Sequence, residues 1–153
     1  MITLNYQLSP SWNRKTNEVD LASADETVLR YEVLLGDVIL NANGHDFSAK
    51  WGWVPVVDFA ASLRHIVNKL NEQNGLETKF EFTESEAALR FKRNDDMVLI
   101  SASYASGEAH VPLAELTASV ESFSRRVASE LSQQFPPLCE NKPFQQLLSV
   151  PAQ

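Results

Sequence analysis

The chain opens with alternating apolar and polar side chains, a pattern that predicts β-strands in its first third. Residues 2–8 alternate strictly and predict a half-buried strand. The polar residues 11–27 predict an irregular segment, for which Trp12 and Leu21 would be the main apolar anchors. The next predicted elements are a strand at 28–35, a turn at Gly36-Asp37, strands at 38–42 and 45–50, and between these two a hairpin turn at Asn43-Gly44, where positive φ is tolerated.

Longer stretches with apolar residues at every third or fourth position predict helices. The first runs from Pro55, which suits an initial helical turn, to about Glu72, with Gly75 as its C-terminal stop. The second begins at Pro112 and is ended by Pro136-Pro137. Between them the pattern predicts strands from Thr78, around Leu89–Phe91, at 97–104 and at 108–111, with turns at Asn94–Asp96 and Ser106-Gly107, and a short helix at about 143–150 closes the chain.

These elements predict a single α+β domain over residues 1–153. We expect one antiparallel sheet in a meander–helix–meander–helix order, with both long helices packed on one face. Two packed sheets with the helices at their ends are the alternative. The helices match each other at a shift of 57 residues, and Leu29-Arg30-Tyr31 matches Leu89-Arg90-Phe91 at a shift of 60. An internal strand–strand–helix repeat over about 28–75 and 87–135 would explain this match, as would the periodicity common to such units.

Composition and charge narrow the classes of function. Asp and Glu number 20 against 13 Lys and Arg, for a formal net charge of −7. Affinity for nucleic acids comes mostly from Lys and Arg on phosphates, so nucleic acid is not expected as a partner. The single cysteine, Cys139, allows no intrachain disulfide, and neither a signal peptide nor a membrane span is evident. We expect a cytoplasmic protein without a membrane partner.

The sequence contains no motif typical of catalysis or metal binding. His45, His65 and His110 lack the spacing of a helical metal pair. Cys139 has no neighbouring histidine to activate it, and the five glycines are too scattered for a phosphate-binding loop. We therefore expect no metal, no cofactor and no enzymatic activity.

Acidic residues are concentrated between residues 72 and 86, where five glutamates accompany one lysine. This run is typical of a solvated hairpin edge, in which Lys79 and Glu81 would meet Arg90 and Lys92 across strands. It also suits an electrostatic patch for a basic partner. The candidate carboxylates for such contact are Glu77, Glu81, Glu84, Glu86, Asp95 and Asp96, of which the last two are also explained as turn residues.

Trp51-Gly52-Trp53 is the second candidate for partner contact. In an extended chain both indoles point to the same side, just before the helix that begins at Pro55. Such a pair commonly caps the core where sheet meets helix. Alternatively, Trp51 and Trp53 would line a groove or anchor an interface, since Trp is enriched among binding hot spots.

In size, acidity and meander–helix–meander–helix layout, the chain resembles the small acidic immunity proteins of bacterial contact-dependent growth inhibition and other polymorphic toxin systems. The stretch WVPVVDF at residues 53–59 is also similar to proteins from such loci. The resemblance implies a non-enzymatic cytosolic protein that occludes the active site of a cognate toxin, often a basic nuclease. It carries over no functional residue.

Other classes of function remain open at this point. An enzyme or small-molecule binder would use a pocket between sheet and helices, with His45, Asp46, His110 or the tryptophans converging on it. A structural adaptor would instead form a homodimer through its sheet edges. The sequence does not predict the oligomeric state.

Overall fold

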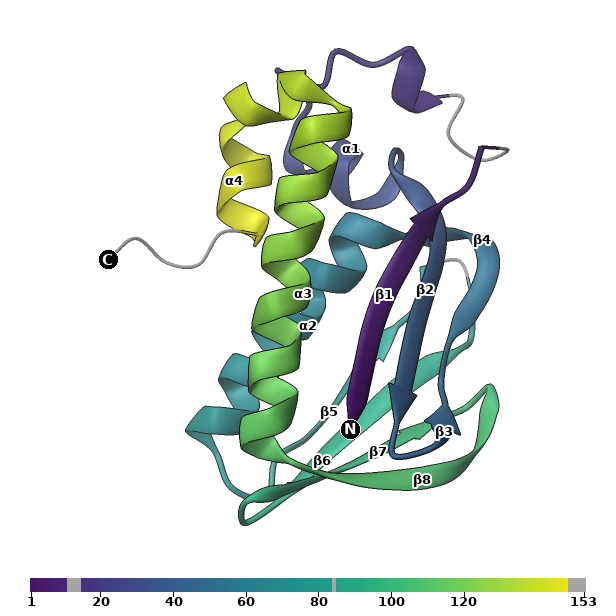
Figure 1. Cartoon of the computed structure of the whole chain (residues 1–153), viewed down its shortest axis with the longest axis vertical. Coiled ribbons are helices and arrows are strands. Elements are labelled where there is room, and N and C mark those ends of the chain that lie inside the picture. Colours follow the sequence, from purple (N-terminus) through teal and green to yellow (C-terminus); the bar gives the residue numbers. More distant parts are fainter. Residues whose placement is uncertain (11–14, 84, 149–153) are drawn as a thin grey trace.

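Within the described residues, the strands form two antiparallel sheets that follow one another along the chain (Figure 1). The computed structural model describes residues 1–10, 15–83 and 85–148. In the first sheet, β2 (Leu35–Ala42) pairs with each of the other strands, which are β1 (Ile2–Leu8), β3 (His45–Asp46) and β4 (Ala49–Pro55). The second sheet is a meander in chain order of β5 (Glu77–Glu81), β6 (Ala88–Asn94), β7 (Met97–Ala102) and β8 (Ala105–Pro112).

The long helices α2 (Val56–Glu72) and α3 (Leu113–Gln134) lie side by side and pack against both sheets (Figure 1). Their buried faces join the inner faces of the strands in a shared hydrophobic core. The shorter helical elements are η1 (Lys15–Asn17), α1 (Glu26–Tyr31), η2 (Pro136–Glu140) and α4 (Lys142–Leu148). The α+β class predicted from the sequence is therefore confirmed, as is the packing of long helices on antiparallel sheet.

The prediction of a single sheet is wrong in detail, because α2 stands between the two groups of strands. β4 runs directly into this helix, whose 17 residues carry the chain away from the first sheet. β5 then pairs with β6 instead of returning to β4. The helices do not lie at the ends of the two sheets, as the alternative arrangement would require, but contact strands of both.

Residues 28–35 were predicted as a strand, and the structure corrects this to α1 followed by a short connection. Asp25 caps the helix by accepting a hydrogen bond of 2.9 Å from the backbone N–H of Val28. Leu29, fully buried, anchors the helix in the core. Because a six-residue helix and an alternating strand place similar residues inward, the pattern was ambiguous. Leu29–Tyr31 is thus helical, whereas Leu89–Phe91, the segment that it matches in sequence, is a strand.

The turns differ from prediction wherever a glycine lies inside a strand. Gly36 and Asp37 belong to β2, and a Cβ at Gly36 would lie 2.0 Å from the carbonyl oxygen of Gln7 on β1. Gly107 lies within β8, beside the His45 imidazole, instead of in a turn. These glycines allow close approach of neighbouring groups, whereas Asn43-Gly44 forms the predicted turn with φ of 50° and 87°.

The remaining predictions agree closely with the described residues. The helices begin directly after Pro55 and Pro112, as predicted, and the predicted strand at 45–50 is divided between β3 and β4. Leu21 is buried, as expected of an anchor, whereas Trp12 lies outside the described residues. The final helix ends within the described chain at Leu148, and the last residues of its predicted range lie outside it.

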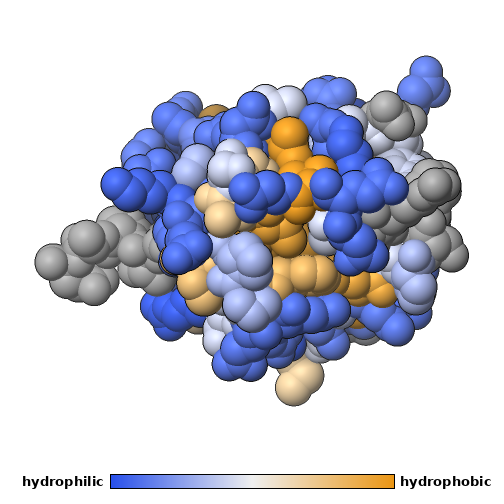
Figure 2. Space-filling view, turned by 90° about the horizontal axis from the view of Figure 1, so that it is seen from above, coloured by the Kyte–Doolittle hydropathy of each residue, from blue (hydrophilic) through white to orange (hydrophobic). Residues whose placement is uncertain are grey.

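The end of the molecule nearest α1 has a hydrophilic rim around apolar side chains at its centre (Figure 2). Among the described residues, Met1 and Tyr31 are the large hydrophobic side chains that are substantially exposed. The apolar side chains seen at this end are therefore partly covered by their neighbours. No described helix is long and apolar enough to cross a membrane.

Candidate functional site

Trp51 and Trp53 on β4 form a stacked pair at one edge of the first sheet. Their ring centroids lie 5.2 Å apart with an interplanar angle of 24°. Trp51 also makes edge-to-face contacts with Phe82, at 5.1 Å, and with Tyr104, at 5.3 Å. The prediction that both indoles point to the same side is confirmed. We call Trp51, Trp53 and Tyr104 the aromatic surface, with Phe82 beneath it.

The tryptophan pair lies where the pairing of β2 with β4 is irregular. The register between β2 and β4 shifts between Gly36 and Val38, so β4 departs from regular pairing there. Gly52 has a φ of 80°, and its N–H donates a 2.8 Å hydrogen bond to the Asp37 carboxylate. Residues with a side chain rarely adopt this backbone conformation, so the position between the tryptophans requires a glycine.

Tyr104 joins the aromatic surface from the turn between β7 and β8. Its hydroxyl donates a 2.6 Å hydrogen bond to the backbone carbonyl of Phe47. Burial raises the pKa of the Tyr104 phenol well above its usual range, and the negative charge of Asp46 raises it further. Tyr104 therefore stays neutral and fixed at neutral pH, and it ties the second sheet to the first.

An open hollow lies over the aromatic surface. It encloses about 530 Å³ and is lined by Trp51, Trp53, Tyr104, Ser85 and Ala87. The tryptophans are partly buried, with one side packed against the core and the other facing the hollow. The indoles thus cap the core and also line the hollow, while their contact with a partner stays a prediction.

Three carboxylates lie near residues of the aromatic surface, in the chain or in space. Asp37 holds the backbone at Gly52, Asp46 acts electrostatically on Tyr104, and the exposed Glu86 lies between two lining residues. The pKa of the Asp46 carboxyl is lowered mainly by hydrogen bonds from Ser48. The positive charge of Lys50, next to Trp51, lowers it further. Glu84, another predicted contact, lies outside the described residues. The described charges around the aromatic surface are predominantly negative.

The other predicted glutamates lie on the outer face of the second sheet, where cations face them. Glu77 is opposite Lys92 on the neighbouring strand, and Lys79 is opposite Arg90. Glu81 forms an ion pair of 3.7 Å with Lys79. The acidic run is therefore balanced in part, by Lys92 opposite Glu77 and by Lys79 beside Glu81. Lys79 lies opposite Arg90, as expected, but Glu81 lies opposite Ala88 and not opposite a cation of β6.

Asp95 and Asp96 belong to the turn between β6 and β7, as their alternative interpretation held. Asp95 has a φ of 54° and exchanges hydrogen bonds with Asn74, and the carbonyl of Asp96 accepts one from Leu113. The seven residues of β6 separate this turn from the aromatic surface. The structure thus places Glu86 between two residues that line the hollow with Trp51 and Trp53, and it places these two aspartates elsewhere.

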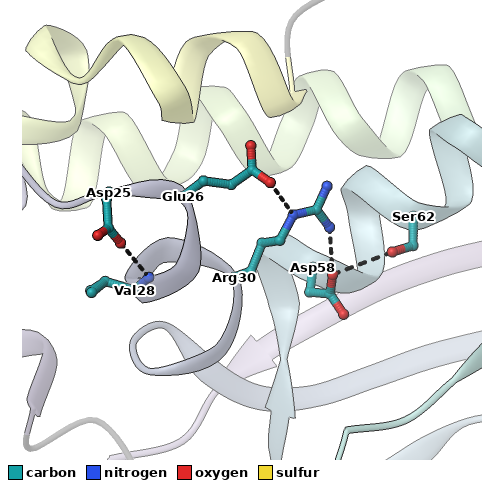
Figure 3. Close-up of polar contacts among 6 residues, drawn as sticks. All are labelled: Asp25, Glu26, Val28, Arg30, Asp58 and Ser62. Atoms are coloured by element: carbon teal, nitrogen blue, oxygen red, sulfur yellow. Dashed lines mark hydrogen bonds and ion pairs between the residues drawn. The ribbon is translucent and has the colours of Figure 1, made fainter.

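A second site, which the sequence did not predict, lies where α1 meets α2 (Figure 3). Arg30 extends between Glu26 and Asp58, and its Nη1 donates to Asp58 Oδ1 at 2.5 Å. The Ser62 hydroxyl donates to the same oxygen at 3.3 Å. Burial raises the pKa of the Asp58 carboxyl, while the bonds from Arg30 and Ser62 act in the opposite direction. A single carboxylate within the apolar run 54–61 was the signal for this site.

A groove of about 320 Å³ extends from this ion pair along β5. One wall is formed by α1 and α2 and the other by β5 and the residues after it. The helical wall consists of Arg30, Tyr31, Asp58, Ser62, His65 and Ile66, and the strand wall of residues 78–81 and 83. We call this the β5 groove.

The other residues considered for chemistry do not converge on a cavity. His45 stacks on Phe47 and contacts Gly107, while His110 is exposed on β8. Among the described residues, no group of three His, Cys, Asp or Glu side chains is placed to hold a metal ion. Cys139 is exposed, and its thiol lies 3.9 Å from the carbonyl of Ser132.

Comparisons with known proteins place no relative beside this chain. No family model, no curated protein and no solved structure matches it. A functional proposal therefore depends on the chemistry of the two sites described above, the aromatic surface and the β5 groove.

Proposed function

We propose that this chain is a non-enzymatic binding protein that neutralises a basic protein partner, in the manner of an immunity protein that inhibits its cognate toxin. The observation that carries the proposal is the stacked Trp51–Trp53 pair, which faces an open hollow. Large aromatic side chains that are held rigidly lose little entropy on binding, and Trp and Tyr are enriched among binding hot spots.

The chemistry of the aromatic surface favours a cationic group. An Arg guanidinium or Lys ammonium is attracted to the face of an indole, an effect worth about 0.5–2 kcal/mol. Asp37, Asp46 and Glu86 would add attraction over a longer range, and the net charge of −7 would speed the encounter with a basic protein. An interface of standard size would bury about 1,600 Å² in total.

Inhibition would work by occlusion. A nuclease binds its substrate in a groove lined by Lys and Arg, which contact phosphates. The carboxylates of this chain would take the place of those phosphates, and the tryptophans would pack against the groove wall. The substrate would then be excluded without any reaction on the immunity protein itself.

The alternative of an enzyme or small-molecule binder would use the β5 groove, which lies between sheet and helices. Its buried carboxylate is engaged by Arg30 and Ser62 through the same oxygen, Asp58 Oδ1. The bond from Arg30 links α1 to α2 through Asp58, and the bond from Ser62 holds the same carboxylate within α2. Together these bonds order the helical wall of the groove. This favours a structural role for the ion pair over a catalytic one.

The proposal is tested by toxicity and rescue. The reading frame that precedes this gene in its source genome is expressed in a bacterial host, with and without this chain. We expect arrested growth that the wild-type chain restores and that Trp51→Ala/Trp53→Ala fails to restore. His110→Ala, which removes an exposed ring far from the hollow, is the matched control and should rescue fully. A preceding frame that is harmless, or rescue by the double variant, would overturn the proposal.

A second test needs no knowledge of the partner. A displayed library of random 12-residue peptides is selected on the immobilised chain, and the enriched peptides are measured by quenching of tryptophan fluorescence. We expect Arg and Lys to be enriched and affinity to fall by at least tenfold in Trp53→Ala. Enrichment of acidic peptides would contradict the cationic partner.

A further inference from the structure

The edge strands of the two sheets differ in how their outward backbone groups are satisfied. On β1, the carbonyl of Leu4 accepts a hydrogen bond from Arg126 of α3 at 2.5 Å. On β8, the carbonyl of His110 accepts one from the Asn43 side chain at 2.7 Å. On β4, regular pairing is interrupted beside Gly52. Each of these edges is clamped or irregular, and each is a poor template for another strand.

β5 is different, because residues 78–81 of this edge strand line the open groove. The N–H of Phe82 donates to Ala87, and the N–H of Arg93 donates to Leu76. Antiparallel pairing alternates, so the even-numbered residues between these bonds face β6. The N–H and C=O groups of Glu77, Lys79 and Glu81 consequently point away from the sheet, and within the described chain no strand pairs with this edge.

We propose that an extended segment of the protein partner binds in the β5 groove as an additional antiparallel strand. This inference rests on the proposed function and assigns that partner a second contact, distinct from the aromatic surface. Strand addition takes its affinity from main-chain hydrogen bonds and its specificity from alternate side chains. Here Glu77, Lys79 and Glu81 offer six such backbone groups along one edge.

Charge along the edge determines the chemistry of the segment. The side chains of Glu77, Lys79 and Glu81 alternate in sign and are exposed on the outer face. An incoming strand places a residue directly opposite each of them, at a distance of about 5 Å between Cβ atoms. The favoured segment therefore carries a basic residue, an acidic residue and a basic residue at alternate positions, in keeping with a basic partner.

The intervening side chains of the segment would point into the groove. They would meet the apolar Phe80 and Ile66 together with the polar Asp58 and Ser62. Threonine suits both kinds of neighbour, because its methyl group packs while its hydroxyl hydrogen-bonds, and its branched Cβ favours a strand. Asp58 and Ser62 are held in place by the ion pair to Arg30, so this wall is ordered before binding.

The test uses a defined probe, the capped peptide acetyl-Ser-Lys-Thr-Glu-Thr-Lys-Ser-amide, with hydrogen exchange of individual backbone amides followed by NMR. In the free chain, the outward N–H groups of Glu77, Lys79 and Glu81 should exchange faster than those of Thr78 and Phe80. With peptide bound, we expect the three outward amides to slow by at least tenfold and the other two to change little. Protection without this alternation would overturn strand addition.

Matched controls separate backbone pairing from charge. Lys79→Pro removes one outward N–H without removing a bond to β6, and Lys79→Ala keeps that N–H while removing the same charge. We expect peptide binding to be lost in Lys79→Pro and retained in Lys79→Ala. The charge-swapped peptide acetyl-Ser-Glu-Thr-Lys-Thr-Glu-Ser-amide should bind about tenfold more weakly than the first peptide. Equal binding by the two variants, or by the two peptides, contradicts the proposal.

The two proposals fail in different experiments. If strand addition is wrong, the first peptide leaves the β5 amides unprotected, while rescue of growth still depends on Trp51 and Trp53. If the proposed function is wrong, growth rescue fails, whereas the peptide still protects alternate amides of β5. Displacement of the peptide by the toxin, measured by loss of that protection, would join the two sites in one complex.

Discussion

The aromatic surface and the outer face of the second sheet were both predicted as partner contacts, yet their surroundings differ. Trp51 and Trp53 are neighbours in the chain and remain neighbours in space, at 5.2 Å. The glutamates of β5 are also close in the chain, but Glu77 lies opposite Lys92 of β6 and Glu81 pairs with Lys79 of its own strand. A cluster defined by local spacing survives folding, whereas a charge run is reshaped by the strand that pairs with it.

The difference also separates stability from recognition. The aromatic surface is continuous with the core, because Phe82 beneath it contacts Trp51, Tyr104 and the buried rings of Phe59 and Phe80. The outer face of the second sheet touches solvent, and its ion pairs are exposed. Substitutions at the aromatic surface should therefore change both stability and binding, and substitutions on the charged face should change stability very little.

Phe82→Ala is expected to have the largest effect on stability. The side chain is 2% exposed and is enclosed by aromatic rings, so its removal leaves a cavity. We expect the free energy of unfolding to fall by about 3–5 kcal/mol. Urea denaturation followed by circular dichroism measures this, with Phe82→Leu as a milder control. A loss below about 1 kcal/mol would show that the aromatic surface is not part of the core.

Trp51→Ala should come next. Because Trp51 is partly buried and contacts Trp53, Phe82 and Tyr104, its loss should cost about 2–3 kcal/mol of stability. Binding to a basic partner should weaken by a further factor of about 30, as for a hot spot. Calorimetric titration at a temperature where the variant is folded separates these effects. Full binding by folded Trp51→Ala would remove the aromatic surface from the interface.

Tyr104→Phe should cost about 1 kcal/mol near neutral pH, because it removes the hydrogen bond to Phe47. Its clearer signature lies in alkaline solution. Burial raises the pKa of Tyr104 in the folded chain, so above about pH 10 the unfolded chain ionises first and stability falls. Tyr104→Phe should flatten this alkaline decline.

Tyr6 provides a second test of the predicted loss of stability in alkaline solution. Burial also raises the pKa of Tyr6, whose hydroxyl bonds to Glu130, so Tyr6→Phe should flatten the decline in the same way. The two effects should add, because the tyrosines lie in different parts of the fold. Stability that is equally pH-dependent in the double variant would show that other groups control it.

Glu77→Gln should have the smallest effect. This side chain is exposed and opposite Lys92, so we expect the free energy of unfolding to change by less than about 0.5 kcal/mol. Thermal denaturation in low and in high salt measures it, and Glu86→Gln beside the aromatic surface is the comparison. Glu86→Gln should slow association with a basic partner more than Glu77→Gln does. If Glu77→Gln slowed association more than Glu86→Gln, the partner would be recognised by the charged outer face of the second sheet.

The sequence was informative wherever neighbouring residues determine the structure. The repeated apolar stripe after Pro55, the turn at Asn43-Gly44 and the shared side of the tryptophans depend on a few adjacent positions, and the structure confirms all three. Strand pairing joins distant segments, so the division into two sheets did not follow from periodicity. Arg30 and Asp58 are 28 positions apart, and only the packing of α1 on α2 brings them together.

Short elements were the other source of error. α1 has six residues, too few to distinguish a helical period from strict alternation, and its identity depends on the Asp25 cap and on burial of Leu29. Similarly, Gly36 and Gly107 resemble turn residues but lie in strands, because another part of the chain approaches them closely. These features are decided by tertiary contacts that no single segment encodes.

The attachment of β1 has a consequence for the order of assembly during synthesis. Arg126 and Glu130 of α3 bind Leu4 and Tyr6, partners that lie 122 and 124 positions earlier in the chain. β1 therefore leaves the ribosome well before α3, and its outer edge is covered only after that helix has been made. Until then an exposed apolar strand is open to neighbouring nascent chains, and any delay in translation between β8 and α3 would lengthen that interval.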